Sequence, residues 1–459
     1  KPRLPSLNDP EVTKQETGYD ISLSWEDIGE GNLYSVYLKD MATDIEIEET
    51  TSENEITVSS LKIGRYEWQI KRKNSLGQES DLSTPQEIEA GIFTKYYGGS
   101  ADDRAKQIIP SNSGGYIVLA TTKSPEISAT AGSLADDWIF KVDEQGEMVW
   151  QYISSSNHGD RFRSIIESTD GSIYAVGYDR ESSKGLALKL TSSGAKEWET
   201  LNNTSQSSYL AFRQVIEFNN TIYALSEEWE SGSKSVNNLY VITKEDGAVS
   251  DPIEIPAPAI PDLKSISVYE LLVTSSGNLI IAGTVNTIEG EYFVGTGAFV
   301  LEVDSNLDVI MTWNNVNEYL HYGVGDVKEL SNGRYVVLGV AMHGGNIAIS
   351  EIESNGTNYR SYVSDNEMYG DQRIAVGDNG NFYGVFSQDG DTLTFMSFNS
   401  NLMIDEQTDF LDFGEYANPV STIKNEDDSF TFVINESHND NFHNDIVILK
   451  RGMDNPASW

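Results

Sequence analysis

The chain has 459 residues, enough for two or three domains, or for a large closed β architecture beside a smaller unit. Its 72 acidic and 31 basic residues give a formal net charge of −41, so the surface repels phosphate backbones and anionic lipids, and we expect no nucleic-acid partner. The absence of cysteine excludes disulfides, thiolate zinc sites and a cysteine nucleophile.

The apolar runs are short, and none approaches the roughly 18 residues that a membrane-spanning helix needs. No such segment is therefore predicted. The chain contains 38 glycines and 23 tyrosines, as expected for a β-rich folded protein. It begins with Lys1 instead of Met, which is compatible with removal of an export signal.

Residues 1–90 differ from the rest of the chain. Hydrophobic and polar residues alternate in residues 21–25, 34–38 and 61–70, the period of half-buried strands. Trp25 on an early strand, Leu61 and Tyr66 five residues apart, and a glycine-containing hairpin before the last strand resemble a fibronectin type III domain. In that sandwich the tyrosine hydroxyl bonds to backbone at a corner. Trp25 and Tyr66 are therefore interpreted as structural residues.

From residue 92 the chain repeats. The sequence pattern of residues 103–150 recurs in residues 160–198, and looser copies continue to the carboxyl end. Corresponding positions in the predicted third strand of each copy are Lys141, Lys189, Ile242, Glu302, Glu351, Ser397 and Lys450. Seven copies of four-strand length predict a seven-bladed β-propeller, because a lone four-stranded sheet cannot cover its own faces whereas radial packing buries them. The fold class is thus all-β, a sandwich followed by a propeller.

The repeat also predicts how the ring closes. Residues 91–97 match the stretch that follows the third strand in later copies, such as residues 149–152, yet they precede the first copy. We expect them to be the outer strand of the last blade, paired with residues 445–450, which removes free sheet edges. The predicted domains are residues 1–90 and 91–459. Residues 84–91 form a junction too short for a flexible tether, so a preferred orientation is expected.

Turn residues separate the predicted strands. Pairs such as Asp170-Gly171 and Asn332-Gly333 divide the first predicted strand of a copy from the second, and Gln145-Gly146 follows a third strand. These residue types tolerate the positive φ of tight hairpins. The acidic and Asn side chains in these turns are therefore interpreted as turn chemistry and not as ligands.

The first two copies, with an Asp near the start, a Gly-Gly-Tyr or Asp-Gly turn and a closing Gly-x-x-x-Trp, resemble degenerate repeats of exported bacterial surface propellers. The resemblance implies a location outside the cell or on the outer-membrane surface of a Gram-negative bacterium, released or anchored as a lipoprotein. It does not imply a defined activity.

The histidines point to one face of the predicted propeller. His158 and His321 fall in segments that join one blade's outer strand to the next inner strand, whereas His343, His438 and His443 fall between second and third strands. Both kinds of connection lie on the rim where propellers usually bind ligands, so all five histidines are expected there.

Aromatic residues join the histidines in these predicted loops, and their rings could stack on sugars or on side chains of a protein partner. The opposing interpretation is that such residues simply collect in exposed loops. The predicted binding residues are Trp229, Tyr319, His321, Tyr322, His343, Tyr369, Tyr416 and His158.

No metal motif is present. His438 and His443 flank an Asn- and Asp-rich loop, but it lacks the His-Glu-x-x-His pattern and the EF-hand spacing. A solvated loop is the favoured interpretation and no cofactor is predicted; calcium is the metal expected if one binds.

Catalytic signatures are equally sparse. Asp103 and Asp160, at the starts of inner strands, could serve as acid and base for glycoside cleavage. The next four copies carry Leu210, Ile266, Tyr322 and Tyr369 there, and an Asp beside an Arg is also a simple loop-capping ion pair. No sialidase-type Asp box, Gly-x-Ser-x-Gly elbow or phosphate-binding loop occurs.

The sequence therefore favours a non-enzymatic exported or cell-surface protein, expected to be a monomer, whose propeller rim binds a carbohydrate or a protein. The alternative is a carbohydrate-active enzyme, a hydrolase or lyase, that uses Asp103, Asp160 and a histidine of the rim. A purely structural scaffold is a third possibility that the sequence does not separate from the first.

Overall fold

The computed structural model describes most of the chain, and the statements below concern those residues. They are residues 1–15, 18–128, 134–154, 161–202, 209–229, 235–287, 297–316, 323–340, 346–367, 374–377, 381–388, 392–399, 402, 404–410, 417–427, 429–438 and 443–452. Within them every regular element is a β-strand, so the all-β class predicted from the sequence is confirmed.

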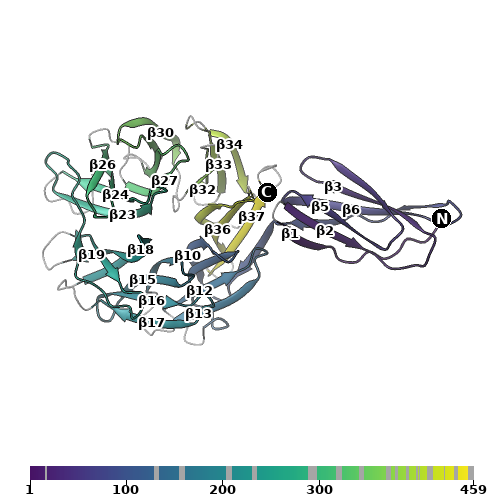
Figure 1. The fold of residues 1–459 in the computed structure, drawn as a ribbon, viewed down its shortest axis with the longest axis horizontal. Helices are drawn as coiled ribbons and strands as arrows, with labels where there is room; N and C mark the ends of the chain where they lie inside the picture. The colour runs from purple at the N-terminus through teal and green to yellow at the C-terminus, as the bar shows by residue number, and fades with distance from the viewer. Residues whose placement is uncertain are drawn as a thin grey trace.

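Two antiparallel sheets form the amino-terminal unit (Figure 1). The first sheet has the order β1-β2-β5, with β1 Glu11–Gln15, β2 Gly18–Ser24 and β5 Glu55–Leu61. The second has the order β4-β3-β6-β7, and β8 also pairs with β6. Its strands are β3 Leu33–Asp40, β4 Glu46–Thr51, β6 Gly64–Lys73, β7 Glu79–Leu82 and β8 Gln86–Ala90.

Alternate side chains of both sheets meet in one core, which makes this unit a β-sandwich. Ile21 and Leu23 on β2 pack with Val36 on β3 and with other buried residues of β6. Trp25 is 1% exposed and lies in the same core. The hydroxyl of Tyr66 donates a 2.8 Å hydrogen bond to the backbone oxygen of Lys62, so the structural roles predicted for Trp25 and Tyr66 are confirmed.

In the described part of the chain, seven antiparallel sheets follow the sandwich in chain order, and we number these seven from first to seventh. The first sheet has β10 Asp103–Pro110, β11 Tyr116–Thr122, β12 Asp136–Val142 and β13 Met148–Ser154; the second has β14 Phe162–Glu167, β15 Ile173–Asp179, β16 Lys184–Leu190 and β17 Lys196–Leu201. The third has β18 Tyr209–Phe218, β19 Thr221–Trp229, β20 Ser235–Val236, β21 Asn238–Ile242 and β22 Ile253–Glu254; the fourth has β23 Ser265–Val273, β24 Leu279–Asn286, β25 Gly297–Val303 and β26 Val309–Asn314. The fifth has β27 Gly323–Glu329, β28 Tyr335–Val340, β29 Asn346–Ile352 and β30 Asn358–Glu367; the sixth has β31 Ala375–Val376, β32 Phe382–Gln388, β33 Thr392–Phe398 and β34 Ile404–Phe410. The seventh has β35 Asn418–Lys424, β36 Ser429–His438, β37 His443–Gly452 and β9 Phe93–Tyr97.

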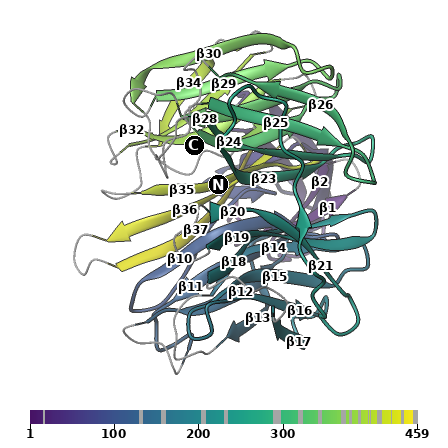
Figure 2. The same ribbon diagram turned by 90° about the vertical axis from the view of Figure 1, so that its left-hand side faces the viewer.

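Each sheet buries both faces against its two neighbours. On β11, Val118 packs toward the seventh sheet, whereas the next residue, Leu119, packs toward the second. Equivalent apolar layers join every consecutive pair of sheets, including the fifth to the sixth and the seventh to the first. Figures 1 and 2 show the sheets around a common centre, with β10–β17 and β23–β30 on opposite sides. This radial arrangement is that of a β-propeller.

The last sheet joins the two ends of the ring. β9 pairs antiparallel with β37, with Phe93 opposite Lys450 and Tyr97 opposite Ile446. A strand from just after the sandwich thus completes a sheet whose other strands come from the end of the chain. This is the pairing that the repeat implied for residues 91–97 and 445–450.

The sandwich extends from the edge of the propeller beside β37 (Figure 1). The hydroxyl of Tyr19 on β2 donates a 2.9 Å hydrogen bond to Oδ2 of Asp427, which lies before β36. Lys14 on β1 pairs at 2.6 Å with Glu144 in the turn after β12. Gly91 has a φ of 72°, and a Cβ there would lie 2.2 Å from the Tyr19 ring, so this glycine lets the ring pack against the linker.

Candidate functional site

Of the eight residues that the sequence predicted for binding, Trp229 lies in the described part of the chain. Tyr319, His321, Tyr322, His343, Tyr369, Tyr416 and His158 lie outside the described residues. His438 and His443 end β36 and begin β37 and are paired across that hairpin, and the intervening residues 439–442 also lie outside.

Trp229 belongs to an aromatic group that the sequence did not reveal. It lies directly opposite Tyr209 in the β18–β19 pair, so the two side chains share one face of the third sheet. On that face the Tyr209 ring lies 4.7 Å, centroid to centroid, from the ring of Tyr178 at the end of β15. All three side chains are half-buried. We call Tyr178, Tyr209 and Trp229 the aromatic rim cluster.

A second feature lies on the innermost strands. Within the described residues, six of them carry a β-bulge at the corresponding position, where one residue has no partner in the second strand. The bulge residues are Lys106, Arg163, Arg213, Tyr269, Gly325 and Val420. A bulge bends its strand and re-aims a side chain, and bulges are frequent next to functional sites.

Three consecutive bulge residues are cations, and each reaches toward the next sheet. The Lys106 ammonium donates a 2.7 Å hydrogen bond to the backbone oxygen of Phe162, at the start of β14. The Arg163 guanidinium comes within 3.5 Å of the Tyr209 hydroxyl on β18. The Arg213 guanidinium lies 5.9 Å from the ring centre of Tyr269 on β23. We call Lys106, Arg163 and Arg213 the cationic arc.

The cationic arc adjoins the aromatic rim cluster through Tyr209, which touches both. Arg163 is exposed, and the side chain of Arg213 is 35% exposed while it pairs with Glu227 at 2.6 Å. Arg104, at the start of β10, is 56% exposed and pairs with Asp102 at 3.0 Å. The starts of the first three inner strands therefore present guanidinium groups and aromatic rings side by side.

The structure gives Asp103 a structural role. Its carboxylate is fully buried and accepts hydrogen bonds from the Gly99 backbone nitrogen at 2.8 Å and from Ser124 Oγ at 2.6 Å. A buried carboxylate that holds a loop in this way cannot reach a glycosidic bond, so the role considered for Asp103 as acid or base is not supported. Asp160, its predicted companion, lies outside the described residues.

Asp137 is a buried carboxylate next to Lys106 of the cationic arc. Its carboxylate accepts hydrogen bonds from the backbone nitrogens of Arg161 at 3.0 Å and Phe162 at 3.1 Å, and Lys106 Nζ is 3.7 Å away. Burial raises the pKa of this carboxyl to about 6, although Lys106, the two backbone donors and Arg161 act in the opposite direction.

No group of three or more His, Asp or Glu side chains suited to a metal ion occurs within the described residues. The same part of the chain contains no helix with the length and apolar character to cross a membrane.

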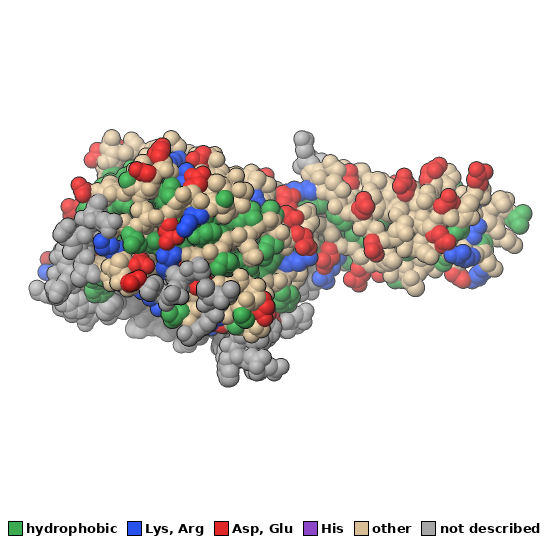
Figure 3. Space-filling view, turned by 90° about the horizontal axis from the view of Figure 1, so that it is seen from below, with side chains coloured by type: hydrophobic (Ala, Val, Ile, Leu, Met, Phe, Trp, Pro, Cys, Tyr) green, Lys and Arg blue, Asp and Glu red, His purple; other side chains and the backbone are tan. Residues whose placement is uncertain are grey.

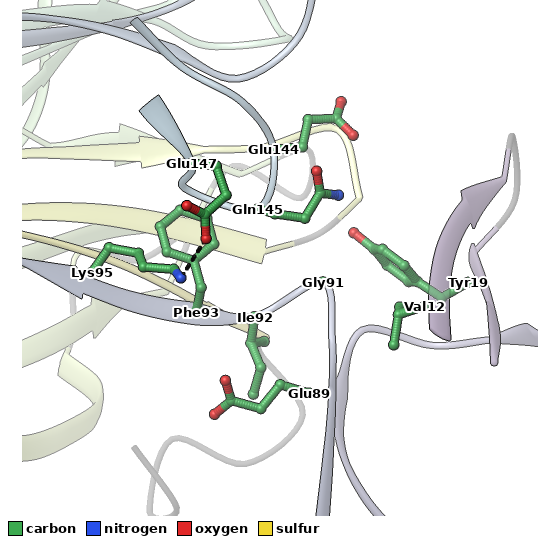
Figure 4. Close-up of a pocket in the computed structure, with 10 residues that line it drawn as sticks. All are labelled: Val12, Tyr19, Glu89, Gly91, Ile92, Phe93, Lys95, Glu144, Gln145 and Glu147. Atoms are coloured by element: carbon green, nitrogen blue, oxygen red, sulfur yellow. Dashed lines mark hydrogen bonds and ion pairs between the residues drawn. The ribbon is translucent and has the colours of Figure 1, made fainter. Parts of the chain in front are cut away.

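A cavity of about 220 Å³ lies at the junction of the sandwich and the propeller (Figure 4). Three glutamates, Glu89, Glu144 and Glu147, are among its lining residues. Each has a cationic partner: Lys14 for Glu144, Lys95 for Glu147 and Arg65 for Glu89, at 2.6, 2.6 and 3.5 Å. Because these charges are already balanced within the chain, we interpret the cavity as part of the joint between the domains and not as a ligand site.

The comparisons with known proteins describe the fold. No protein-family model and no curated protein matches the sequence. An ulvan lyase of a new polysaccharide lyase family, bound to GlcA(1-4)Rha3S, has a similar structure at a TM-score of 0.50 and 10% identity, over 79% of this chain and 99% of that one. Polysaccharide lyase Uly1 is similar at a TM-score of 0.50 and 10% sequence identity, over 78% of this chain and 91% of the lyase chain. The β-propeller domain of the Trilobed protease from Pyrococcus furiosus is similar at a TM-score of 0.41 and 11% sequence identity. The match covers 89% of this chain and 99% of that domain's chain.

Proposed function

We propose that this protein is an exported protein of a Gram-negative cell surface that recognises a polysaccharide on its propeller. In this proposal the sandwich is a fibronectin type III-like domain and the ring is a seven-bladed propeller. The Tyr66 hydrogen bond to Lys62 supports the first assignment, and the seven successive sheets in the described residues support the second.

The aromatic rim cluster is the observation on which the proposal rests. Tyr178, Tyr209 and Trp229 come from two adjacent sheets and gather at the end of the sheets from which the inner strands start. Half-buried aromatic rings suit the apolar faces of sugar rings, and the neighbouring guanidinium of Arg163 offers donors to hydroxyl or acidic groups.

Between cleavage and binding without cleavage, we propose cleavage as the activity to test first. Two of the proteins with a similar fold are polysaccharide lyases, which favours the carbohydrate-active alternative over the non-enzymatic interpretation of the sequence. The catalytic groups would differ from the pair considered at first, because Asp103 is buried.

A panel of purified polysaccharides tests the proposal, with binding followed by affinity electrophoresis and cleavage by new reducing ends and unsaturated ends. We expect at least one polysaccharide to bind, and Trp229→Ala and Tyr209→Ala each to weaken binding about tenfold. Tyr96→Ala is the matched control, because Tyr96 is 57% exposed on β9, away from the cluster. Equal binding by all four proteins would overturn the rim as the site.

A further inference from the structure

We propose that the polysaccharide is acidic and that its carboxylate or sulfate groups bind the cationic arc formed by Lys106, Arg163 and Arg213. This inference rests on the proposed function, because it names the chemical class of the same ligand. It is carried by the three successive bulges that place cations at corresponding positions of adjacent inner strands, each in contact with the next sheet.

The bulges make the arc a repeated feature of the fold. In a regular strand, side chains alternate between the two faces, and both faces of an inner strand are buried by the neighbouring sheets. The extra residue of a bulge breaks this alternation, and at the bulges of the first three sheets the Arg163 side chain is exposed while Lys106 and Arg213 are half-buried. Lys106, Arg163 and Arg213 occupy this position in three successive sheets, so their charges follow one another from sheet to sheet.

Arg163 is the arc's most available charge. Its side chain is exposed, and the described residues provide it with a contact to a tyrosine hydroxyl at 3.5 Å but with no carboxylate partner. A planar guanidinium can donate two parallel hydrogen bonds to a carboxylate or a sulfate, and such charge-assisted pairs are stronger than neutral ones. Lys106 and Arg213 hold the corresponding positions in the sheets on either side of it. Lys106 lies 3.7 Å from Asp137, and Arg213 pairs with Glu227 at 2.6 Å.

The charge of the rest of the molecule makes the arc selective. With a net charge of −41, most of the surface repels an acidic polymer, and acidic side chains recur along the face shown in Figure 3. The other described bulge positions, Tyr269, Gly325 and Val420, are uncharged. An acidic chain would therefore be held over the first three sheets, next to the aromatic rim cluster.

The test compares three classes of polysaccharide: a polyuronate, a sulfated galactan and neutral dextran. We expect the acidic polymers to bind more tightly than dextran, and this preference to fall as salt is added, because salt screens exposed charges. The polyuronate and the sulfated galactan distinguish carboxylate from sulfate as the bound group.

Substitutions of the arc give the second arm. Arg163→Gln should weaken binding of the acidic polymer about tenfold, and Arg163→Lys, which keeps the charge, should recover much of the loss. Lys196→Gln is the control, because Lys196 is 51% exposed on the outer strand β17. Thermal unfolding of each variant separates lost binding from lost folding.

Two results would overturn the inference, and only the second would also overturn the proposed function. If dextran binds as tightly as the acidic polymers, is lost in Trp229→Ala and is unaffected by Arg163→Gln, then the proposed function stands and the acidic ligand is wrong. If no polysaccharide of any class binds, both proposals fail.

Discussion

Tyr19 and Asp427 are 408 residues apart in the chain and are joined by a 2.9 Å hydrogen bond across the junction of the two domains. Asp427 also accepts a 2.7 Å bond from the ammonium of Lys450, whose side chain is 3% exposed. Burial opposes ionisation of Asp427, but the Lys450 charge and the hydrogen bonds outweigh it and lower its pKa. Burial and the Asp427 charge raise the pKa of the Tyr19 hydroxyl, so it stays a donor.

These contacts predict that substitution of Asp427 destabilises the protein more than substitution of Tyr19. Asp427→Ala leaves the Lys450 ammonium buried without its partner, and we expect it to lower the free energy of unfolding of the propeller by about 3–5 kcal/mol. Tyr19→Phe removes one hydrogen bond and leaves the ion pair intact, so about 1–2 kcal/mol is expected. Urea unfolding measures both values, and equal costs would contradict the assignment of Lys450 to Asp427.

The junction glycine yields a second prediction. Gly91→Ala should disturb the orientation of the sandwich, because the new methyl group would lie 2.2 Å from the Tyr19 ring. Gly77→Ala is the matched control: Gly77 has a φ of 76° against 72° for Gly91, but nothing lies within 4 Å of its Cβ position.

Both variants carry the backbone strain of an alanine in the left-handed region, about 1–2 kcal/mol. Only Gly91→Ala should also change the small-angle scattering profile, because only there does the new methyl group meet a side chain, that of Tyr19, which joins the two domains. A profile identical to that of the unmodified protein would show that the ring of Tyr19 turns away without moving the domains.

The repeat pattern predicted much of the architecture because it reports on local geometry. Lys141, Lys189 and Glu351, chosen as corresponding positions, all lie in the third strand of their sheets. Gly171 and Gly333, predicted in tight turns, have φ values of 81° and 78°. Such features depend on neighbouring residues, so a single sequence contains the signal.

The candidate site depended on contacts that cross between sheets, which a local pattern does not contain. Tyr209 was missed because it lies in a strand and not in a loop, and its relation to Tyr178 and Trp229 follows from pairing and packing. The cationic arc did leave a trace: Lys106 and Arg163 each stand three residues after Asp103 and Asp160, the positions already compared between copies. What the repeat could not show was the β-bulge at each of these two positions.

A third prediction concerns Asp103. Asp103→Asn should lower the free energy of unfolding by about 1–2 kcal/mol, because the amide weakens the bonds that Gly99 and Ser124 donate to the buried carboxylate. Binding and any cleavage of a polysaccharide should persist, since this side chain is fully buried. Loss of cleavage with unchanged stability would restore Asp103 as a catalytic acid or base.

The last prediction is a pH dependence that arises at Asp137. Its pKa in the folded protein, about 6, lies above the ordinary value of 3.8, so the folded state binds the proton more tightly than the unfolded state. The contribution of this carboxyl to stability is therefore greatest at low pH and falls as the pH rises from about 4 through 6, by roughly 3 kcal/mol in total. Asp137→Asn should flatten this part of the stability profile.

The same titration should change ligand binding. Below pH 6 the carboxyl of Asp137 is neutral and no longer offsets the charge of Lys106, 3.7 Å away, so the cationic arc becomes more positive. We expect an acidic polysaccharide to bind more tightly at pH 5 than at pH 7, with a smaller difference in Asp137→Asn, whose amide resembles the protonated acid at every pH. Titration calorimetry at both pH values measures the difference. Because all other groups are shared by the two proteins, an equal pH dependence in both would show that Asp137 does not control the charge of the arc.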